Sequence, residues 1–281
     1  MKDDLKKLTD LPDCKKPHKT YQQHAIEQEN TPYGLREIEA VAVMEGCFPE
    51  KFGVPRQAGI VRSARGIVRF LPPFNHENYL HGLELSSHIW LTFGFHHNQW
   101  NGKATVRPQR LGGNERMGVF ATRSSFRPNG LGLSAVKIEA IHWQEGMIEV
   151  SGHDLVDGTP IYCVKPYIPF ADSLPEAVSE FATKKPEDYP VFFTKKVKET
   201  LHSLKEEAPY LETLITEVIS QNPTPQFHKD SSRIYGVSLR SWNISFKGVS
   251  QEDLQEVVLD QDGDILLYKK AFLVMEIKAR E

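Results

Sequence analysis

Five arginines fall within twenty-one residues, and only one acidic residue, Glu115, interrupts them: Arg107, Arg110, Arg116, Arg123 and Arg127. Glycines stand between these arginines, and glycine lets a backbone approach a ligand closely and present its N–H groups. A guanidinium binds phosphate or carboxylate through two parallel hydrogen bonds. Two such arginines would be ordinary surface charges, but five with one local acid favour a site for an anion, of the kind that a nucleotide or nucleic acid presents.

Two shorter stretches carry weaker signals of the same chemistry. In "FGVPRQAG", Pro55 fixes the backbone, while Arg56 and Gln57 offer hydrogen-bond donors and an acceptor. In "DLVDGTP", the run 157–159 is first of all a turn, because Asp, Gly and Thr are typical turn residues. An aspartate and a threonine beside a flexible glycine also suit ribose hydroxyls or an amino group.

Other chemistries find less support. The histidines crowd one region, but no H-E-x-x-H motif or cysteine at ligand spacing accompanies them, so pocket or core histidines are favoured over a metal site: His76, His81, His88, His96 and His97. His88 and His96 would share one face if a single strand continued through both. The run "DQDGDI" (260–265) fits a hairpin turn better than a calcium loop. Hydrolase, Walker A and Rossmann motifs are absent from the sequence.

Composition limits the remaining classes. The chain has 281 residues, 40% of them hydrophobic, and a formal net charge of -3, so attraction to a polyanion must come from a local patch. Its three cysteines are far apart, which favours a reducing compartment. The polar N-terminus does not match a secretory signal, and no run of about 18 apolar residues occurs. We therefore expect a cytoplasmic protein with no membrane span and no metal.

The elements that must position these residues are mostly strands. Short apolar or alternating runs punctuated by Gly, Pro and Asn predict strands in 35–45, 59–71, 88–97, 117–122, 131–141, 147–156 and 159–168, in an antiparallel sandwich or barrel. "RPNG" (127–130) predicts a tight turn between two of them.

The second half has a different pattern. Ser173 and Glu176 form a capping-box signal for a helix over 173–182, and helical spacing of apolar residues follows in 194–221. Strands return in 234–246 and 264–279. The prediction is a mainly β chain with three parts: a polar N-terminal extension (1–34), a β domain (35–175) and a smaller C-terminal α+β domain (176–281).

Three motifs together resemble one family. "GVPRQAGIVRS", "RLGGNERMGVFATRSSFRPNGLGLS" and "DLVDGTPIYCVKPYIPFADSLP" resemble the TrmO (YaeB-like) family of S-adenosylmethionine-dependent tRNA methyltransferases. The resemblance is close from Ile38 to Leu174 and weaker as far as Phe246. It implies a small antiparallel β-barrel followed by a C-terminal α+β domain, paired as a homodimer with the cofactor near the subunit interface. It also implies methyl transfer to N6 of a threonylcarbamoyl-modified adenosine just 3′ of the anticodon.

The same resemblance implies roles for individual residues. The motifs assign S-adenosylmethionine contacts to Pro55, Arg56, Gln57, His96, His97, Arg123, Leu133, Asp157, Gly158, Thr159 and Pro160. We expect Arg123 or Arg127, or both, to clamp an anion: the substrate carboxylate, a tRNA phosphate or the cofactor carboxylate. Three further arginines would follow the tRNA backbone: Arg107, Arg110 and Arg116. Together with Arg127 they form the expected substrate-binding set. No residue is assigned as the proton acceptor.

The sequence departs from the family pattern at three places. His97 stands where the family has glutamine, Gly130 replaces the proline of "RPNP", and "NPTPQF" (222–227) replaces a block that usually reads like "DPRPAY". Two alternatives therefore stay open. One is a tRNA- or nucleotide-binding barrel without catalysis, and the other is a methyltransferase that acts on a different substrate.

Overall fold

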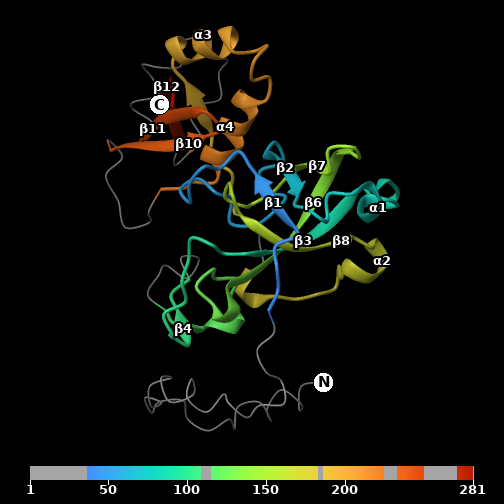
Figure 1. Cartoon of the computed structure of the whole chain (residues 1–281). Helices are drawn as coiled ribbons and strands as arrows, with labels where there is room; N and C mark the ends of the chain where they lie inside the picture. The colour runs from blue at the N-terminus through green and yellow to red at the C-terminus, as the bar shows by residue number, and fades with distance from the viewer. Residues whose placement is uncertain (1–36, 109–114, 183–185, 225–232, 250–270, 281) are drawn as a thin grey trace.

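Six antiparallel strands form a closed barrel in the computed structural model, which describes residues 37–108, 115–182, 186–224, 233–249 and 271–280. Around the barrel the strands follow the order β1 (Ala42–Glu45), β2 (Arg65–Phe70), β7 (Met147–Ser151), β6 (Leu131–His142), β3 (His88–Gly94) and β8 (Pro160–Pro166). Figure 1 shows the barrel in the middle of the molecule. The predicted mainly β fold with an antiparallel barrel is confirmed.

Alternation along the strands explains the barrel core. In β3, Ile89, Leu91 and Phe93 are buried while the residues between them face outward, as expected for a strand with one apolar face. β3 pairs with β6 on one side and with β8 on the other. This double pairing brings the ends of three strands together, and two of the motifs lie at those ends.

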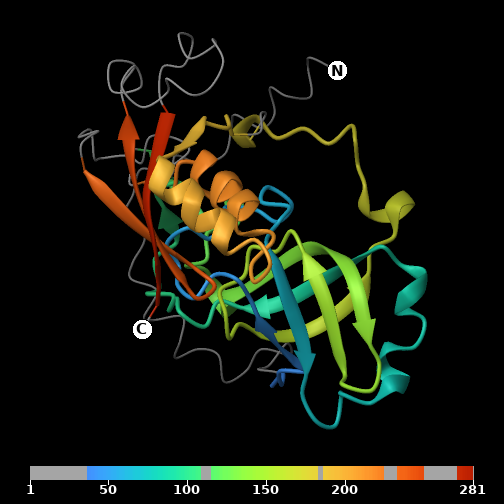
Figure 2. The same cartoon turned by 90° about the horizontal axis from the view of Figure 1, so that it is seen from above.

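The C-terminal part is a four-stranded sheet with two helices. The sheet order is β10 (Ile234–Leu239), β11 (Trp242–Val249), β12 (Ala271–Ala279) and β9 (Val191–Phe193). Helices α3 (Lys195–Ser203) and α4 (Leu211–Ser220) cover one face of this sheet (Figure 2). Their apolar faces, with Val197 and Leu214 among them, join the sheet residues in one core. The predicted α+β character of this part is confirmed.

The loop between β1 and β2 ties the barrel to the C-terminal part. Four of its residues belong to the same core as α3, α4 and the C-terminal sheet: Cys47, Phe48, Val61 and Ala64. Phe48 also meets the buried ring of His153 edge-on, with ring centroids 5.3 Å apart. The intervening run 55–57 is therefore held from both sides, which fixes the position of the "PRQ" motif.

Several sequence expectations are wrong in detail. No α-helix forms over 173–182, where only η8 (Glu180–Ala182) makes a 3-10 turn and the apolar Leu174 and Val178 are 63% and 87% exposed. A capping signal cannot by itself sustain a helix whose apolar residues have nothing to pack against. Short helical turns also occur earlier than expected, at α1 (Glu77–Leu80), η4 (Leu83–Leu85) and α2 (Pro169–Asp172).

The arginine-rich region is less regular than predicted. The strand expected over 117–122 is only β5 (Met117–Gly118), which pairs with β4 (Thr105–Val106) and is followed by the 3-10 turn η6 (Val119–Ala121). Figure 1 shows this hairpin standing away from the barrel at its lower left. The strand expected over 59–71 begins only at Arg65, and the predicted helical region 194–221 is two helices separated at Pro209.

Candidate functional site

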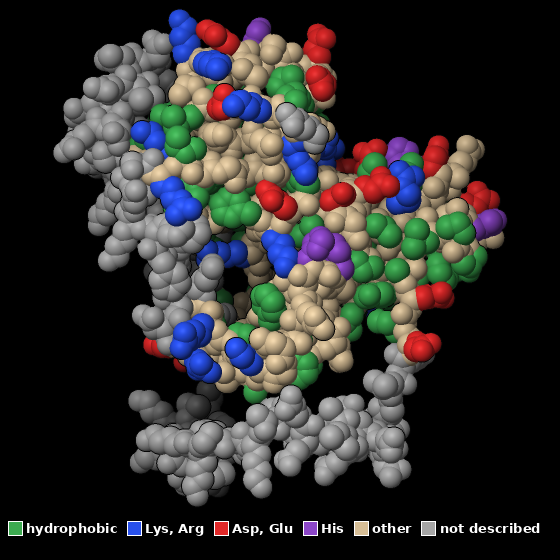
Figure 3. Space-filling model, turned by 60° about the vertical axis from the view of Figure 1, so that its left-hand side comes forward, with side chains coloured by type: hydrophobic (Ala, Val, Ile, Leu, Met, Phe, Trp, Pro, Cys, Tyr) green, Lys and Arg blue, Asp and Glu red, His purple; other side chains and the backbone are tan. Residues whose placement is uncertain are grey.

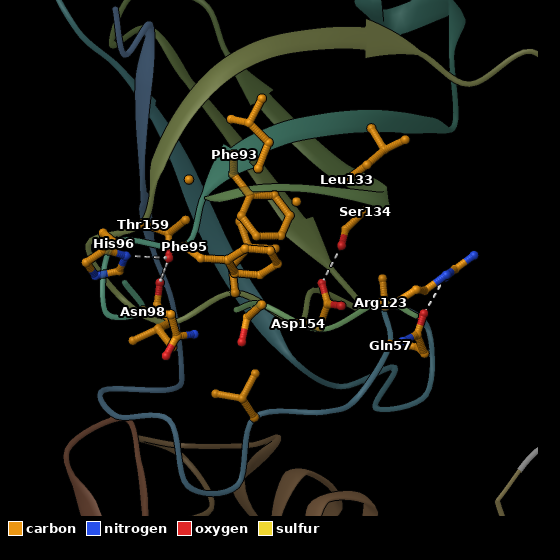
Figure 4. A pocket seen from close by; sticks show the side chains of 18 of the residues that line it. Gln57, Phe93, Phe95, His96, Asn98, Arg123, Leu133, Ser134, Asp154 and Thr159 are labelled. Carbon is orange, nitrogen blue, oxygen red and sulfur yellow. Dashed lines mark hydrogen bonds between the residues drawn. The ribbon is translucent and has the colours of Figure 1, made fainter. Parts of the chain in front are cut away.

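One cavity of about 840 Å³ lies at the end of the barrel where β3, β6 and β8 meet. Its wall comes from the β1–β2 loop, the end of β3, the segment before β6, the start of β6 and the run before β8. Figure 4 shows side chains from these segments turned toward a common space. Segments from positions 51 to 159 of the chain thus converge on one pocket.

Arg123 and Gln57 meet on one wall of the pocket. The Arg123 guanidinium donates a hydrogen bond to the Gln57 side-chain oxygen, and the Gln57 amide nitrogen donates to the backbone oxygen of Arg56 (Figure 4). Arg123 is an exposed residue, so its remaining donors face the cavity or solvent. A ligand with an anionic group can therefore bind here without breaking an ion pair.

Asp154 is a carboxylate on the same side of the pocket. The Ser134 hydroxyl donates to its Oδ1 at 2.6 Å, and the backbone N–H of Ala58 also bonds it. Burial raises the pKa of the Asp154 carboxyl above its ordinary value, while the Ser134 bond and the charge of Arg123 lower it. Among the described residues that line this cavity, Asp154 is the single carboxylate. Lysine and arginine side chains also line it and are positively charged.

Two histidines stand on the opposite side. The rings of His96 and His97 lie 3.9 Å apart between centroids, and the His96 Nδ1 is 3.4 Å from the Thr159 hydroxyl. The Thr159 hydroxyl donates to the backbone oxygen of Val156 at 2.6 Å, so its orientation is fixed. Burial of the His96 ring, together with the charge of His97, lowers the pKa of His96 below its ordinary value. The His96 ring is therefore neutral at neutral pH.

The pocket has an apolar floor built around a glycine. The rings of Phe93 and Phe95 meet edge-on, with centroids 5.3 Å apart. A Cβ added at Gly132 would lie 2.4 Å from the Phe93 ring and 2.9 Å from the Phe95 ring. The absence of a side chain at Gly132 thus lets both rings approach the β6 backbone closely, which gives the pocket an aromatic surface.

A second cavity of about 770 Å³ adjoins the first. The two cavities share the run 94–98 and Arg127, and the second adds Trp100, Tyr162 and residues 129–130 of the turn η7 (Pro128–Gly130). The turn is closed by a Gly130 N–H to Arg127 O bond of 3.1 Å, and Gly130 O accepts from Phe95 N–H at 2.8 Å. These bonds confirm the predicted turn and fix it against the end of β3.

The structure brings most of the expected cofactor residues to the first cavity. Its lining includes Pro55, Arg56, Gln57, His96, His97, Arg123, Leu133 and Thr159. Asp157, Gly158 and Pro160 do not line it; Asp157 instead accepts a 2.8 Å hydrogen bond from Gly46 N–H, and Gly158 N–H donates to Met44 O at 2.8 Å. These three residues close the loop beside Thr159. His88 and His96 do not share a strand, because β3 ends at Gly94.

The arginine run separates into two groups. Arg123 and Arg127 line the pockets, whereas Arg107 and Arg116 lie beside the β4–β5 hairpin, outside both cavities, and Arg110 lies outside the described residues. Arg116 makes one long hydrogen bond of 3.5 Å, to the Thr105 hydroxyl. Figure 3 shows a small group of positively charged side chains at the lower left of the described part of the molecule, and others spread over the rest of this face.

Sequence reasoning missed four features of the pocket: Asp154, Ser134, Lys51 and the Phe93–Phe95 floor. Lys51 binds the Asn98 side-chain oxygen at 2.7 Å and the backbone oxygen of His97, and so holds the histidine segment in place. Asp154 does stand in the "DLVDGTP" motif, but its partner Ser134 is twenty residues earlier in the chain. No local pattern reveals such a pair, because the barrel register creates it.

Two further features bear on the class of site. Within the described ranges, no group of three or more His, Cys, Asp or Glu side chains is arranged to hold a metal ion. No helix in the described part of the chain combines the length and apolar character needed to cross a membrane.

Comparisons with known proteins give consistent results. The family model for the tRNA-methyltransferase O N-terminal domain matches residues 43–173, and the model for the TrmO C-terminal domain matches residues 186–260. The chain is 42% identical over 217 residues to the tRNA (adenine(37)-N6)-methyltransferase of Escherichia coli, which covers 75% of this chain and 92% of that protein.

Other relatives cover different shares of the chain. The human tRNA (adenine(37)-N6)-methyltransferase is 43% identical over 145 residues, which is 50% of this chain and 32% of the human protein. A crystal structure of TrmO from Pseudomonas aeruginosa superposes with a TM-score of 0.70 at 28% identity, covering 89% of this chain and 100% of that one. A relative from the same organism, 39% identical over 74% of this chain and 89% of its own length, is called a putative S-adenosylmethionine-dependent methyltransferase.

Proposed function

The chain belongs to the tRNA-methyltransferase O family, and we propose that its larger cavity is the methyl-transfer site. The protein is an S-adenosylmethionine-dependent tRNA (adenine(37)-N6)-methyltransferase, like the relatives that carry this name. The observation that supports the site is convergence. The "PRQ" loop, the histidine run, the "ATRS" segment and Thr159 lie far apart in the sequence, yet all line the same space.

The residues of this cavity fit S-adenosylmethionine. The cofactor presents a flat purine, ribose hydroxyls, an α-amino acid and a positively charged sulfur. The floor of Phe93 and Phe95, whose rings pack against Gly132, suits the purine, since aromatic rings stack on bases. Thr159 and His96 offer hydroxyl and ring-nitrogen partners. Arg123 and Asp154 offer opposite charges to the charged groups.

The chain contributes position more than reactivity. The cofactor, when bound, supplies a methyl group on a sulfur that is already a good leaving group. Arg123 and Thr159 would then fix the orientation of the two ends of the cofactor relative to the adenine. Holding two reactants in line can lower the activation free energy of a reaction by up to about 7–11 kcal/mol in favourable cases. A neutral His96 adds no further positive charge beside a cationic cofactor.

The second cavity is the proposed place of the target base. It shares the run 94–98 with the first cavity, and Trp100 and Tyr162 give it aromatic walls. Arg127 lines both cavities and is half-buried, and the described residues offer it no carboxylate partner. We assign Arg127 to the carboxylate that a threonylcarbamoyl group would place on the adenosine, as the family resemblance implies.

The hairpin arginines are proposed to bind the tRNA backbone. Arg107 and Arg116 are exposed and lie outside the cavities, as expected for residues that contact phosphates without reading bases. We also propose a cytoplasmic homodimer. The exposed apolar side chains Phe170, Leu174 and Val178 support the pairing, because a homodimer buries such residues.

The test is methylation of defined tRNA. Purified protein is incubated with S-adenosylmethionine and tRNA prepared from a strain without this activity, and the digested nucleosides are analysed by mass spectrometry. We expect one added methyl group on the modified adenosine next to the anticodon. Methylation of a different nucleoside would contradict the proposed substrate, and cofactor binding without any methylation would favour a binding protein without catalysis.

A further inference from the structure

Asp154 and Arg123 carry opposite charges in one pocket but do not bind each other. Figure 4 shows them as neighbours on the same side, and the charge of Arg123 acts on the Asp154 carboxyl. Arg123 bonds to Gln57, and Asp154 accepts from Ser134. Within the described part of the chain, neither belongs to a salt bridge.

The buried position of the Asp154 carboxylate is costly unless a partner offsets it. A carboxylate withdrawn from water loses solvation, and a nearby guanidinium is the usual partner that restores the loss. Here both groups are instead oriented by neutral side chains, Ser134 and Gln57, which leave the charges unneutralised. A bound molecule with its own anion and cation a short distance apart would satisfy both groups.

We propose that Asp154 and Arg123 form a subsite for the α-amino-acid end of the cofactor, in which Asp154 binds the ammonium and Arg123 binds the carboxylate. This rests on the proposed function, because S-adenosylmethionine is a nucleoside that ends in such a zwitterion. Arg123 matches a carboxylate because its fork donates two parallel hydrogen bonds. The ammonium has three donors, and Asp154 is the single carboxylate among the described lining residues that can accept from it.

The cationic character of the rest of the lining strengthens the assignment. Lys51, Arg56 and Arg127 also face the cavity. Without an anionic group among them, these side chains would repel a cofactor with a net positive charge. The repulsion would be strong because like charges in a partly dehydrated cavity are weakly screened. Asp154 therefore has two effects: it orients the amino group, and it offsets the surrounding positive charge.

Ser134 is the positioning residue of this subsite. It lies on β6 two residues after Gly132, and its side chain is buried. Its hydroxyl donates to Oδ1, and the backbone N–H of Ala58 also bonds this carboxylate, so the group is held in one orientation and its remaining lone pairs can accept from a ligand. Removal of the hydroxyl leaves the charge of Asp154 in place and removes one of the hydrogen bonds that orient it, so a smaller loss of affinity is expected than from removal of the charge.

Four nucleosides separate the two charges of the ligand. S-adenosylmethionine and S-adenosylhomocysteine carry both the ammonium and the carboxylate; decarboxylated S-adenosylmethionine keeps the ammonium alone; 5′-methylthioadenosine has neither. Binding of each to the free full-length protein is measured by titration calorimetry, so no turnover is needed. Asp154→Asn, Arg123→Ala and Ser134→Ala are compared with the wild type.

The expected pattern differs between variants. Asp154→Asn lowers the affinity for the three ligands that have an ammonium by about tenfold or more, which is the usual effect of losing a hydrogen bond to a charged group. The affinity for 5′-methylthioadenosine stays unchanged. Arg123→Ala weakens only the two ligands that have a carboxylate. Ser134→Ala gives the Asp154→Asn pattern with a smaller loss. Glu149→Gln removes a carboxylate that pairs with His142 outside the pocket, and should leave all four affinities unchanged.

Three results would overturn the assignment. Equal weakening of 5′-methylthioadenosine by Asp154→Asn would indicate a general change in the pocket, and unchanged binding of all ligands would show that Asp154 makes no contact. Weakening of S-adenosylmethionine without weakening of S-adenosylhomocysteine would place Asp154 at the sulfonium instead. The proposed function fails separately, if the wild type binds these ligands but does not methylate tRNA.

Discussion

The arginines of one sequence run have two different environments. Arg123 and Arg127 line cavities, with the first held by Gln57 and the second at the wall that both cavities share. Arg107 and Arg116 lie exposed by a two-stranded hairpin, where Arg116 donates a long hydrogen bond of 3.5 Å to the Thr105 hydroxyl. The residue type and the local sequence are similar in both groups, so their surroundings decide what each can recognise.

The difference has a physical consequence. A guanidinium in a cavity is weakly screened by salt and is oriented, so it can select the shape of one anion. A guanidinium on an exposed hairpin is screened and mobile at its tip, so it contributes attraction to many phosphates. The comparison predicts large, ligand-specific effects for pocket arginines and small, salt-dependent effects for hairpin arginines.

The largest effect is expected for Arg127→Ala. The substrate loses a charged hydrogen-bond partner, so kcat/KM for modified tRNA should fall roughly thirtyfold. That ratio corresponds to a loss of about 2 kcal/mol of transition-state stabilisation. Affinity for S-adenosylmethionine should not fall, because Arg123 and Asp154 are intact. Steady-state kinetics with tRNA and calorimetry with the cofactor check the two halves. Arg127→Lys keeps the charge without the fork and should recover only part of the rate, whereas wild-type kinetics for Arg127→Ala would remove Arg127 from the substrate site.

The next effect concerns the turn that holds Arg127. Gly130 has φ 58°, in the left-handed region that a side chain disfavours, although no atom lies within 4 Å of an added Cβ. Gly130→Ala should therefore cost about 1 kcal/mol of unfolding free energy from backbone strain alone. Chemical denaturation measures this cost, with Gly236→Ala as the control, because Gly236 has open space and no positive φ. Equal stability of the two variants would show that the turn adapts without strain.

Gly130 also shows what the sequence could and could not predict. "RPNG" was sufficient to predict a turn, because Asn and Gly both accept the left-handed conformation that Asn129 and Gly130 adopt. The strand at 131–142 was also predictable from its apolar alternation. The contrast is Val119–Ala121, which has strand-forming residues yet makes a 3-10 turn, since no neighbouring strand pairs with it beyond Gly118.

The site was predictable in part for the same reason. Gln57 and Arg123 were each predicted as site residues because each lies in a contiguous motif. Their contact with each other, sixty-six positions apart in the sequence, was not predicted. Asp154 was missed because its special character comes from Ser134 and from burial, and both depend on how β6 and the run before β8 approach each other in the barrel. Long-range register is a property of the closed sheet and has no signature in a short stretch of sequence.

The hairpin arginines should show a smaller effect that depends on salt. Arg107→Ala and Arg116→Ala should each reduce the slope of log affinity for tRNA against log salt by about 1, and weaken binding similarly for different tRNA species. Filter binding over a range of salt concentrations gives the slopes. Lys137→Ala removes a charge that pairs with Glu139 on the barrel and should leave the slope unchanged. A change in kcat with an unchanged salt slope would mean that these arginines act in the site.

The smallest effect is expected from pH, through His96. Burial, then the charges of His97 and Lys51, hold its pKa below the ordinary value of 6.5, while Asp157 and the backbone at Gly94 raise it. The pKa of His96 is lower in the folded than in the unfolded chain, so below pH 6.5 this side chain binds protons more readily in the unfolded chain. The contribution of His96 to stability is therefore present above that pH and is lost as the pH falls below it. His96 is an exposed residue overall, so this contribution is small.

Ligand binding should follow the same sign. Protonation of His96 adds a positive charge to a pocket that already holds Arg123 and Arg56, so affinity for S-adenosylmethionine should fall as the pH drops from 7 toward 5. S-adenosylhomocysteine lacks the sulfonium charge and should lose less affinity over the same range. Calorimetry of both ligands at several pH values measures the difference, and His96→Gln should flatten it. If the difference persists in His96→Gln, then Asp154 is the titrating group, because protonation of its carboxylate would also weaken the binding of a cation. The roles of the two charged groups in the pocket would then have to be assigned again from that pH profile.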